Sequence, residues 1–173
     1  MKTNTKKLVL TGLLVAIEII LSRFFSVQLP FFRISAAFIP LVLMGMLCGP
    51  AYAGAGGAMA DFIGAVLFPA GAYFPGFTLT NALTGVAYGV GLYRQEWEGG
   101  PSWLRITVMI LFVNLVLNLC LNTYWLSIIW GEGYLGLLPA RLGRYVIQAP
   151  IYILVIGFMQ MRLARIRQVA ALN

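Results

Sequence analysis

The sequence predicts an all-α integral membrane protein, folded as a bundle of six transmembrane helices. Hydrophobic residues make up 61% of the chain and charged residues only 10%, whereas about 25% of the residues of a soluble domain are charged. The mean hydropathy is also positive, at +0.89. The 173 residues are predicted to form a single domain, residues 1–173, because the apolar segments follow one another along a chain of the length of one domain.

Six apolar segments account for the predicted helices, since a helix needs about 20 apolar residues to cross a bilayer. Their ranges are 8–25, 36–48, 51–67, 78–94, 103–127 and 139–161. The first resembles a signal peptide, but no small-residue cleavage pattern follows it, so we interpret it as a retained span. The second is too short to span comfortably and is predicted to be a broken or shallow segment, which is tolerated only where protein buries its backbone.

The stretch 72–85, AYFPGFTLTNALTG, lies between the third and fourth segments. Its Pro75-Gly76 pair predicts a turn. Aromatic and hydroxyl-bearing side chains crowd around that pair: Tyr73, Phe74, Phe77, Thr78, Thr80 and Thr84. Within the fourth segment one face carries Phe77, Asn81, Thr84 and Tyr88, at the spacing i, i+4, i+7, i+11.

The fifth and sixth segments each carry a polar stripe of their own. Asn114, Asn118 and Asn122 are four residues apart, and Thr123, Tyr124 and Trp125 follow them. Two interpretations fit the three amides: they can face a ligand, or they can join helices to one another by hydrogen bonds inside the membrane. The sixth segment opens with Arg141, Arg144, Tyr145 and Gln148 at the spacing i, i+3, i+4, i+7.

The basic residues predict the orientation. With both termini in the cytoplasm, eight of the twelve lie inside: Lys2, Lys6, Lys7, Arg94, Arg105, Arg162, Arg165 and Arg167. The other four fall at the outer ends of segments: Arg23, Arg33, Arg141 and Arg144. These four either reach lipid headgroups with long side chains or form a site for an anionic ligand.

The polar stripes of the fourth, fifth and sixth segments all reach the outer half of the membrane in this orientation. Headgroup anchoring explains any one stripe, but a water-accessible pocket open to the outside explains all three. The residues around 32–33 and 73–77 are then expected to cover it. Aromatic rings stack on flat ligands, amides give directional hydrogen bonds, and guanidinium groups clamp carboxylates. The implied ligand is a planar heteroaromatic compound with a carboxylate tail.

Several functions are disfavoured by the residues that the sequence lacks. The chain has no His, and its lysines lie only at positions 2, 6 and 7, so it contains no phosphate-binding G-x-x-x-x-G-K-[ST] loop. We expect no catalytic residues, no cofactor, no metal and no nucleic acid. Cys48 and Cys120 are interpreted as core thiols. For Glu18 and Asp61, both charged at membrane depth, structural pairing and a functional role remain open.

Small residues recur at four-residue spacing, which lets helices approach closely. Gly12 and Ala16 form such a pair on one face of the first segment, and further pairs occur among the glycines of residues 45–64 and at Gly85 and Gly89. Most of these pairs are expected to pack inside the bundle.

Three stretches of the chain resemble the folate-binding substrate-capture subunit, or S component, of energy-coupling factor (ECF) transporters. They are PAGAYFPGFTLTNALTG at 69–85, LNTYWL at 121–126 and PARLGR at 139–144. The similarity extends over nearly the whole chain, including the basic N-terminus and the segment from Pro40 to Pro50. It implies six helices that bind folate from outside with high affinity. It also implies docking on a transmembrane coupling subunit and two cytoplasmic ATPase subunits, which hydrolyse the ATP.

The resemblance and the stripes together define the expected site. The expected ligand-binding residues are Arg33, Tyr73, Phe74, Phe77, Thr78, Asn81, Asn118, Asn122, Tyr124, Trp125, Arg141, Arg144, Tyr145 and Gln148. The family's small-residue docking motif, Ala-x-x-x-Ala, corresponds here to Gly12-x-x-x-Ala16, which keeps the small surface but departs from the motif. Three alternatives remain: an S component for another vitamin such as a different pterin or thiamin, a membrane-embedded enzyme, and a bundle without a ligand.

Overall fold

The computed structural model describes residues 2–29, 32–69, 73–93, 102–131 and 133–171. The chain begins with helix α1 (Lys2–Arg23), continues through a two-stranded hairpin, β1 (Ser26–Leu29) and β2 (Phe32–Ser35), and enters helix α2 (Phe38–Cys48). Helices α3 (Pro50–Leu67) and α4 (Pro75–Leu92) follow. A continuous helical rod then consists of α5 (Trp103–Phe112), the π-helix η2 (Val113–Leu121) and α6 (Asn122–Trp130), and the last helix is α7 (Tyr134–Ala171).

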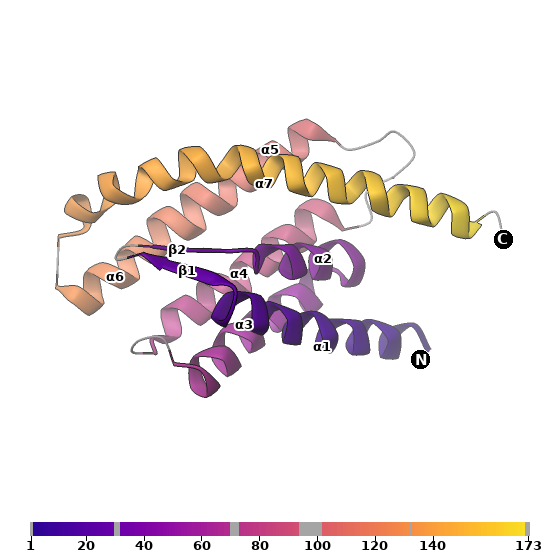
Figure 1. Ribbon diagram of the computed structural model, residues 1–173, viewed down its shortest axis with the longest axis horizontal. Helices are drawn as coiled ribbons and strands as arrows, with labels where there is room; N and C mark the ends of the chain where they lie inside the picture. The colour runs from indigo at the N-terminus through magenta and orange to yellow at the C-terminus, as the bar shows by residue number, and fades with distance from the viewer. Residues whose placement is uncertain (1, 30–31, 70–72, 94–101, 132, 172–173) are drawn as a thin grey trace.

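Within the described residues the helices therefore form six rods, and the rods run between the same two ends of the molecule (Figure 1). The N- and C-termini lie together at one end. The hairpin strands, the start of α4, the end of α6 and the start of α7 lie at the other end (Figure 1). Helices α1 to α4 pack as one group, and α7 packs on α5 and η2. The α4 helix contacts both groups and so joins the two halves of the bundle.

The predicted segments correspond to these helices, with two corrections. Residues 26–29 and 32–35 form a short antiparallel pair of strands in which Ser26 pairs with Ser35 and Leu29 with Phe32; the sequence analysis did not predict these strands, while the rest of the described chain is helical as the all-α class requires. Pro75-Gly76 was predicted to make a turn, but Pro75 occupies the first turn of α4. Proline is favoured at that position because its fixed φ suits a helix and its missing N–H would lack an intrahelical partner anyway.

The contact between α3 and α4 is the most extensive in the bundle, and glycine makes it possible. A Cβ added at Gly85 would lie 2.2 Å from the Ala53 carbonyl oxygen, and one at Gly89 would lie 2.3 Å from Pro50 Cα. The predicted internal packing of the small-residue pairs is thus confirmed for this helix pair. Gly12 differs, because a Cβ added there meets no atom within 4 Å.

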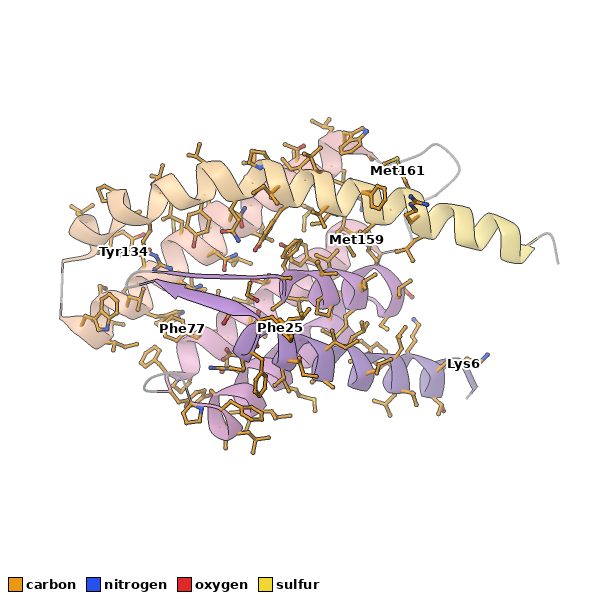
Figure 2. All side chains as sticks on the ribbon, in the orientation of Figure 1. Lys6, Phe25, Phe77, Tyr134, Met159 and Met161 are labelled. Atoms are coloured by element: carbon orange, nitrogen blue, oxygen red, sulfur yellow. The ribbon has the colours of Figure 1, made fainter. Side chains whose placement is uncertain are left out.

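The outer surface of the bundle is apolar. Large hydrophobic side chains point outward from the other helices around the short α2 (Figure 2), and some are largely exposed, such as Leu135 at 79% and Leu104 at 78%. Two of the described helices, Trp103–Trp130 and Arg141–Leu163, are long and apolar enough to cross a membrane. The buried core contains few charged groups, among them Glu18 and Arg141.

Candidate functional site

A polar cavity of about 120 Å³ lies between the two halves of the bundle. One wall comes from α1, α2 and α4, and the other from η2 and α7. The lining residues are Glu18, Ala37, Phe38, Leu41, Asn81, Thr84, Tyr88, Asn118, Tyr145, Gln148 and Tyr152. The polar stripes predicted on three separate helices meet here, since Asn81, Asn118 and Gln148 all line this one cavity.

Asn81 joins three helices at the first wall. Its Nδ2 donates hydrogen bonds to Glu18 Oε1 on α1, at 2.9 Å, and to the carbonyl oxygen of Gly57 on α3, also at 2.9 Å. Both amide hydrogens are thereby used within the protein. Asn81 therefore fixes the position of the Glu18 carboxyl group at the edge of the cavity and leaves its own Oδ1 to meet an occupant.

The second wall is ordered by hydrogen bonds within α7 and η2. The Tyr145 hydroxyl donates to the Asn118 carbonyl oxygen at 2.8 Å, and the Asn118 side-chain Nδ2 donates to the Val113 carbonyl at 3.2 Å. The Gln148 amide donates to the Tyr152 hydroxyl. Wide π-helical turns are rare in proteins, and those that occur are often found at functional sites. Here the π-helical turn that carries Asn118 faces the cavity.

Two aromatic rings close one side of the cavity. Phe38, at the start of α2, stacks on Tyr152 of α7 with ring centroids 3.7 Å apart and an angle of 19° between the planes. This pair joins the two halves of the bundle directly. Its flat faces suit a planar ligand, because aromatic rings favour offset stacking.

A second aromatic cluster surrounds the start of α4. Phe74 lies 5.6 Å from Trp125 and 6.1 Å from Phe77, measured between ring centroids. Trp125 Nε1 donates to Thr80 Oγ1 at 3.1 Å, so the predicted site segments 73–81 and 122–125 do lie against each other. A Cβ at Gly76 would meet Trp125 at 2.5 Å, which explains why only glycine fits between these rings.

The remaining predicted ligand residues have other surroundings. The Thr78 hydroxyl donates to Asp61 Oδ2 at 2.7 Å and lies 3.2 Å from the Tyr73 hydroxyl. Arg141 is buried and donates from Nη1 to Thr123 Oγ1 at 3.1 Å.

Asn122 Nδ2 donates to Asn118 Oδ1 at 3.4 Å, which places Asn122 beside a cavity residue rather than in the cavity wall. Tyr124 is exposed and packs beside Trp125. The side chains of Arg33 and Arg144 lie outside the described part of the structure.

The sequence analysis left seven cavity residues out of the expected site: Glu18, Ala37, Phe38, Leu41, Thr84, Tyr88 and Tyr152. Thr84 and Tyr88 belong to the stripe predicted on the fourth segment, although they were not counted among the ligand residues, and Tyr152 lies one turn beyond Gln148 on the sixth. Glu18 carried a signal as an isolated charge at membrane depth. Phe38 carried none, because its position depends on the hairpin that returns the chain to the cavity.

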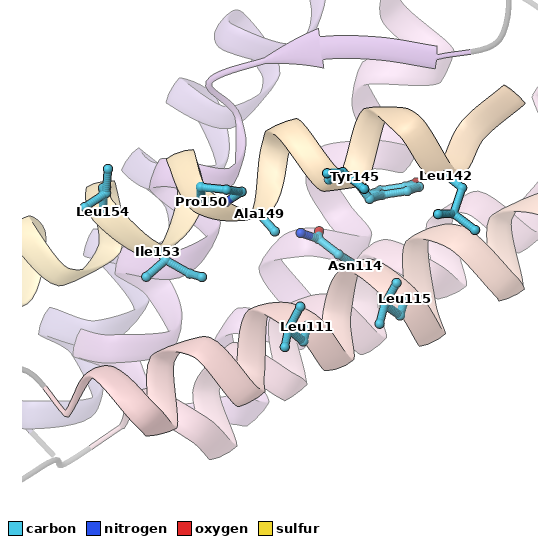
Figure 3. A pocket seen from close by; sticks show the side chains of 10 residues that line it. Leu111, Asn114, Leu115, Leu142, Tyr145, Ala149, Pro150, Ile153 and Leu154 are labelled. Carbon is cyan, nitrogen blue, oxygen red and sulfur yellow. The ribbon is translucent and has the colours of Figure 1, made fainter. Parts of the chain in front are cut away.

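A larger apolar groove, of about 540 Å³, runs between the α5–η2 rod and α7 (Figure 3). Its walls are mostly aliphatic, with Leu111, Leu115 and Leu154 among the exposed lining residues. Because it offers few polar groups, it suits lipid chains better than a polar ligand. Tyr145 lines both this groove and the polar cavity and separates the two.

Comparison with known proteins identifies the fold. The family model described as ECF transporter, substrate-specific component matches residues 6–166. The chain belongs to this family. An ECF substrate-specific component is a membrane protein that serves transport and is not an enzyme, which agrees with the apolar outer surface.

Individual relatives within this family are similar over most of their length. The Folate transporter FolT of Clostridium novyi (strain NT) is 39% identical over 143 residues, which is 83% of this chain and 81% of that protein. The Folate transporter FolT of Leuconostoc mesenteroides subsp. mesenteroides is 29% identical over 157 residues, covering 88% and 83%. A crystal structure of FolT bound with folic acid superposes with a TM-score of 0.84 at 37% identity, over 91% of this substrate-specific component and 94% of that chain.

Gly12 and Ala16 are both exposed on α1. No side chain of the described bundle covers the space beside Gly12. The expected docking face of this ECF component is therefore accessible from outside the bundle.

Proposed function

We propose that this substrate-specific component binds folate from the extracellular side and passes it into the cell as part of an ECF transporter. The observation that carries the proposal is the polar cavity enclosed between the two halves of the bundle. The fold that encloses it is shared with a FolT that holds folic acid. The flat pair Phe38 and Tyr152 suits a pterin ring, and the amides of Asn118 and Gln148 suit its polar edge.

The proposed membrane arrangement is a single domain of six spans with both termini in the cytoplasm. Helix α2 has 11 residues, which are fewer than a helix needs to cross the bilayer. Helix α2 and the hairpin before it therefore cross the membrane together. Residues 26–35 and 73–77 then lie at the extracellular end, where they cover the entrance to the cavity. The partners are a transmembrane coupling subunit and two cytoplasmic ATPase subunits.

The glutamate tail of folate carries two carboxylates, and the arginines at the extracellular end are its proposed partners. At least one of Arg33, Arg141 and Arg144 pairs with the tail. The rings of Tyr73, Phe74, Phe77, Tyr124 and Trp125, with Thr78 and Asn122, form the approach between tail and cavity. Gly12 and Ala16 form the docking face.

Calorimetry on the purified, ligand-free chain tests the proposal. Because the cavity is built from this chain alone, we expect folic acid to bind without ATP and without partner subunits, whereas thiamin gives no heat. We expect Asn81→Ala to weaken folate binding by about tenfold or more, since it removes the tie that positions Glu18. Absence of heat with every folate on folded protein contradicts the proposal, and heat with thiamin alone assigns the site to another vitamin.

A further inference from the structure

We propose that Glu18 recognises the 2-amino-4-oxo edge of the pterin ring and selects against rings that lack the 2-amino group. This inference rests on the proposed folate binding and adds the residue that determines which heterocycle the cavity accepts. It concerns a residue on α1, the helix whose opposite face carries Gly12 and Ala16.

The surroundings of Glu18 show an unfilled hydrogen-bonding capacity. Its side chain is 4% exposed and lines the polar cavity. Oε1 accepts a hydrogen bond from Asn81 Nδ2, while Oε2 has no hydrogen-bond partner among the described residues. An unpaired buried oxygen of this kind is costly, and in native proteins it calls for a specific explanation.

The described cavity wall offers no cation to compensate the carboxyl group. None of the described residues that line it is Lys or Arg, and the nearby amides and hydroxyls of Asn81, Asn118, Tyr145 and Gln148 already take part in hydrogen bonds. The Thr84 hydroxyl also lines the cavity, but it is buried without a partner and does not donate to Glu18. No described protein group donates to Oε2, so a donor on the molecule that occupies the cavity can fill this position. A pair of adjacent N–H groups fits best, because a carboxylate accepts two parallel hydrogen bonds in one plane.

The pterin ring presents such a pair. Its ring N3–H and its exocyclic 2-amino group point in the same direction, so one can reach Oε2 while the other reaches the free lone pair of Oε1. A ring held this way lies flat between the walls and can stack on an outer face of the Phe38–Tyr152 pair. If oxygen replaced the 2-amino group, this oxygen and the Glu18 carboxylate oxygen, both hydrogen-bond acceptors, would face each other. A site built around a donor rejects analogues without it far more strongly than a hydrophobic pocket rejects a missing methyl group.

A purely structural role for Glu18 makes a different prediction. If Glu18 served only to hold α4 through Asn81, a glutamine in its place would do the same, since its Oε1 accepts the same hydrogen bond. Glutamine is nearly identical in shape, but its second polar atom is a donor rather than an acceptor. The Glu18→Gln variant therefore separates ligand recognition from helix packing.

The test compares folic acid with its 2-oxo analogue, in which oxygen replaces the 2-amino group, by calorimetry on the detergent-solubilised full chain. We expect the unmodified protein to prefer folic acid by about tenfold or more, and Glu18→Gln to reduce the preference to about threefold or less. Asp61→Asn is the matched control. Asp61 is a carboxylate on the neighbouring helix that accepts from Thr78 and does not line the cavity, so this variant should keep the full preference.

The outcomes distinguish the role of Glu18 from the proposed binding of folate itself. If Glu18→Gln prefers folic acid over the 2-oxo analogue as strongly as the unmodified protein does, the role of Glu18 is overturned while folate binding stands. The same holds if Asp61→Asn loses as much of this preference as Glu18→Gln does. Absence of folic acid binding in the unmodified protein overturns the proposed function itself. If Glu18→Gln fails to fold, Glu18→Asp replaces it: the carboxyl group then lies one methylene further from the ring. Its preference should fall together with its affinity for folic acid, and an unchanged preference overturns the proposal.

Discussion

Arg141 illustrates how a charged residue near a ligand site can serve the bundle. It is 5% exposed, and its Nη1 donates to Thr123 Oγ1, so it links α7 to α6. Breaking a buried hydrogen bond to a charged group leaves the remaining partner unsatisfied, which costs about 1–3 kcal/mol. Its neighbour Arg144 lies one turn further along the same helix. The two arginines are therefore expected to respond differently to substitution.

Arg144→Ala is expected to weaken folate binding by about tenfold to a hundredfold, because it removes a charge-assisted pair with the glutamate tail. Pteroic acid, which keeps the pterin and the benzoate but lacks the glutamate, should lose little. Calorimetry with both ligands measures the difference. Arg141→Ala is the comparison variant: we expect equal losses for both ligands and a lower midpoint of thermal unfolding. Equal losses for both ligands in Arg144→Ala would assign it a structural role as well.

Single residues were predictable from the sequence where a helical stripe carried them. Asn81, Asn118 and Gln148 could be assigned to one pocket because the topology brings three polar faces to the same depth. Phe38 could not, because its stacking on Tyr152 results from tertiary packing across the bundle.

Helices α3 and α4 approach each other so closely that their backbones are in contact. A methyl group at Gly85 would lie 2.2 Å from the Ala53 carbonyl oxygen and 2.6 Å from its carbon. Neither atom can move without moving helix α3 as a whole. The close approach of α3 and α4 in turn positions Asn81 and Gly57 for their hydrogen bond.

Gly85→Ala is expected to lower the stability of the bundle, although alanine is favoured over glycine inside a helix by about 0.5–1 kcal/mol. Overpacking of a tight contact costs about 1–3 kcal/mol, which outweighs that gain. Thermal unfolding in detergent measures the effect. Gly143→Ala is the matched control, because a Cβ there meets no atom within 4 Å. It should raise the unfolding midpoint slightly, and a similar rise in Gly85→Ala would contradict the packing argument.

The exposed face of α1 has a different role from the packed face of α3. Gly12 and Ala16 leave a small, accessible surface on which another helix can lie closely. Glu18 faces the opposite way, into the cavity. The proposed docking face and the proposed ligand site therefore lie on different sides of one helix.

Ala16→Trp is expected to abolish folate uptake by cells while the affinity of the purified chain for folate stays within about twofold. The bulky ring prevents close approach of a partner helix and does not reach the cavity. Uptake of radiolabelled folate and calorimetry give the two measurements. Leu104→Trp, at an exposed position on α5, is the control and should retain uptake. Loss of binding together with uptake in Ala16→Trp would show that this face belongs to the interior.

Most helix boundaries could be predicted to within a few residues, because long apolar segments are local signals; the prolines that begin α3 and α4 were not used as such signals. The hairpin of residues 26–35 could not be predicted, since four-residue strands next to an apolar helix carry little periodicity. The same applies to the π-helix, which packs against α4 and α7 and has no local sequence signal of its own.

At the scale of the whole molecule, the apolar outer surface and the two ends define how the protein sits in a bilayer. Both termini lie at one end, whereas the hairpin strands, the end of α6 and the start of α7 lie at the other (Figure 1). The even number of crossings in the proposed topology agrees with this arrangement. Lys6 and Lys7 lie near the first end and Arg23 ends α1 near the second, so the positive-inside rule predicts a cytoplasmic position for the terminal end.

Cysteine labelling in intact cells tests this orientation. Cys48 and Cys120 are first replaced by alanine, and a single cysteine is then introduced by Asn4→Cys at the terminal end or by Gly133→Cys at the opposite end. Both positions are exposed, and neither substitution changes the charge of the chain. A membrane-impermeant maleimide should label Gly133→Cys but not Asn4→Cys, because the first faces the medium and the second the cytoplasm. Permeabilised cells serve as the control, in which both should react. The reverse pattern in intact cells would place the cavity entrance in the cytoplasm and rule out capture of folate from outside.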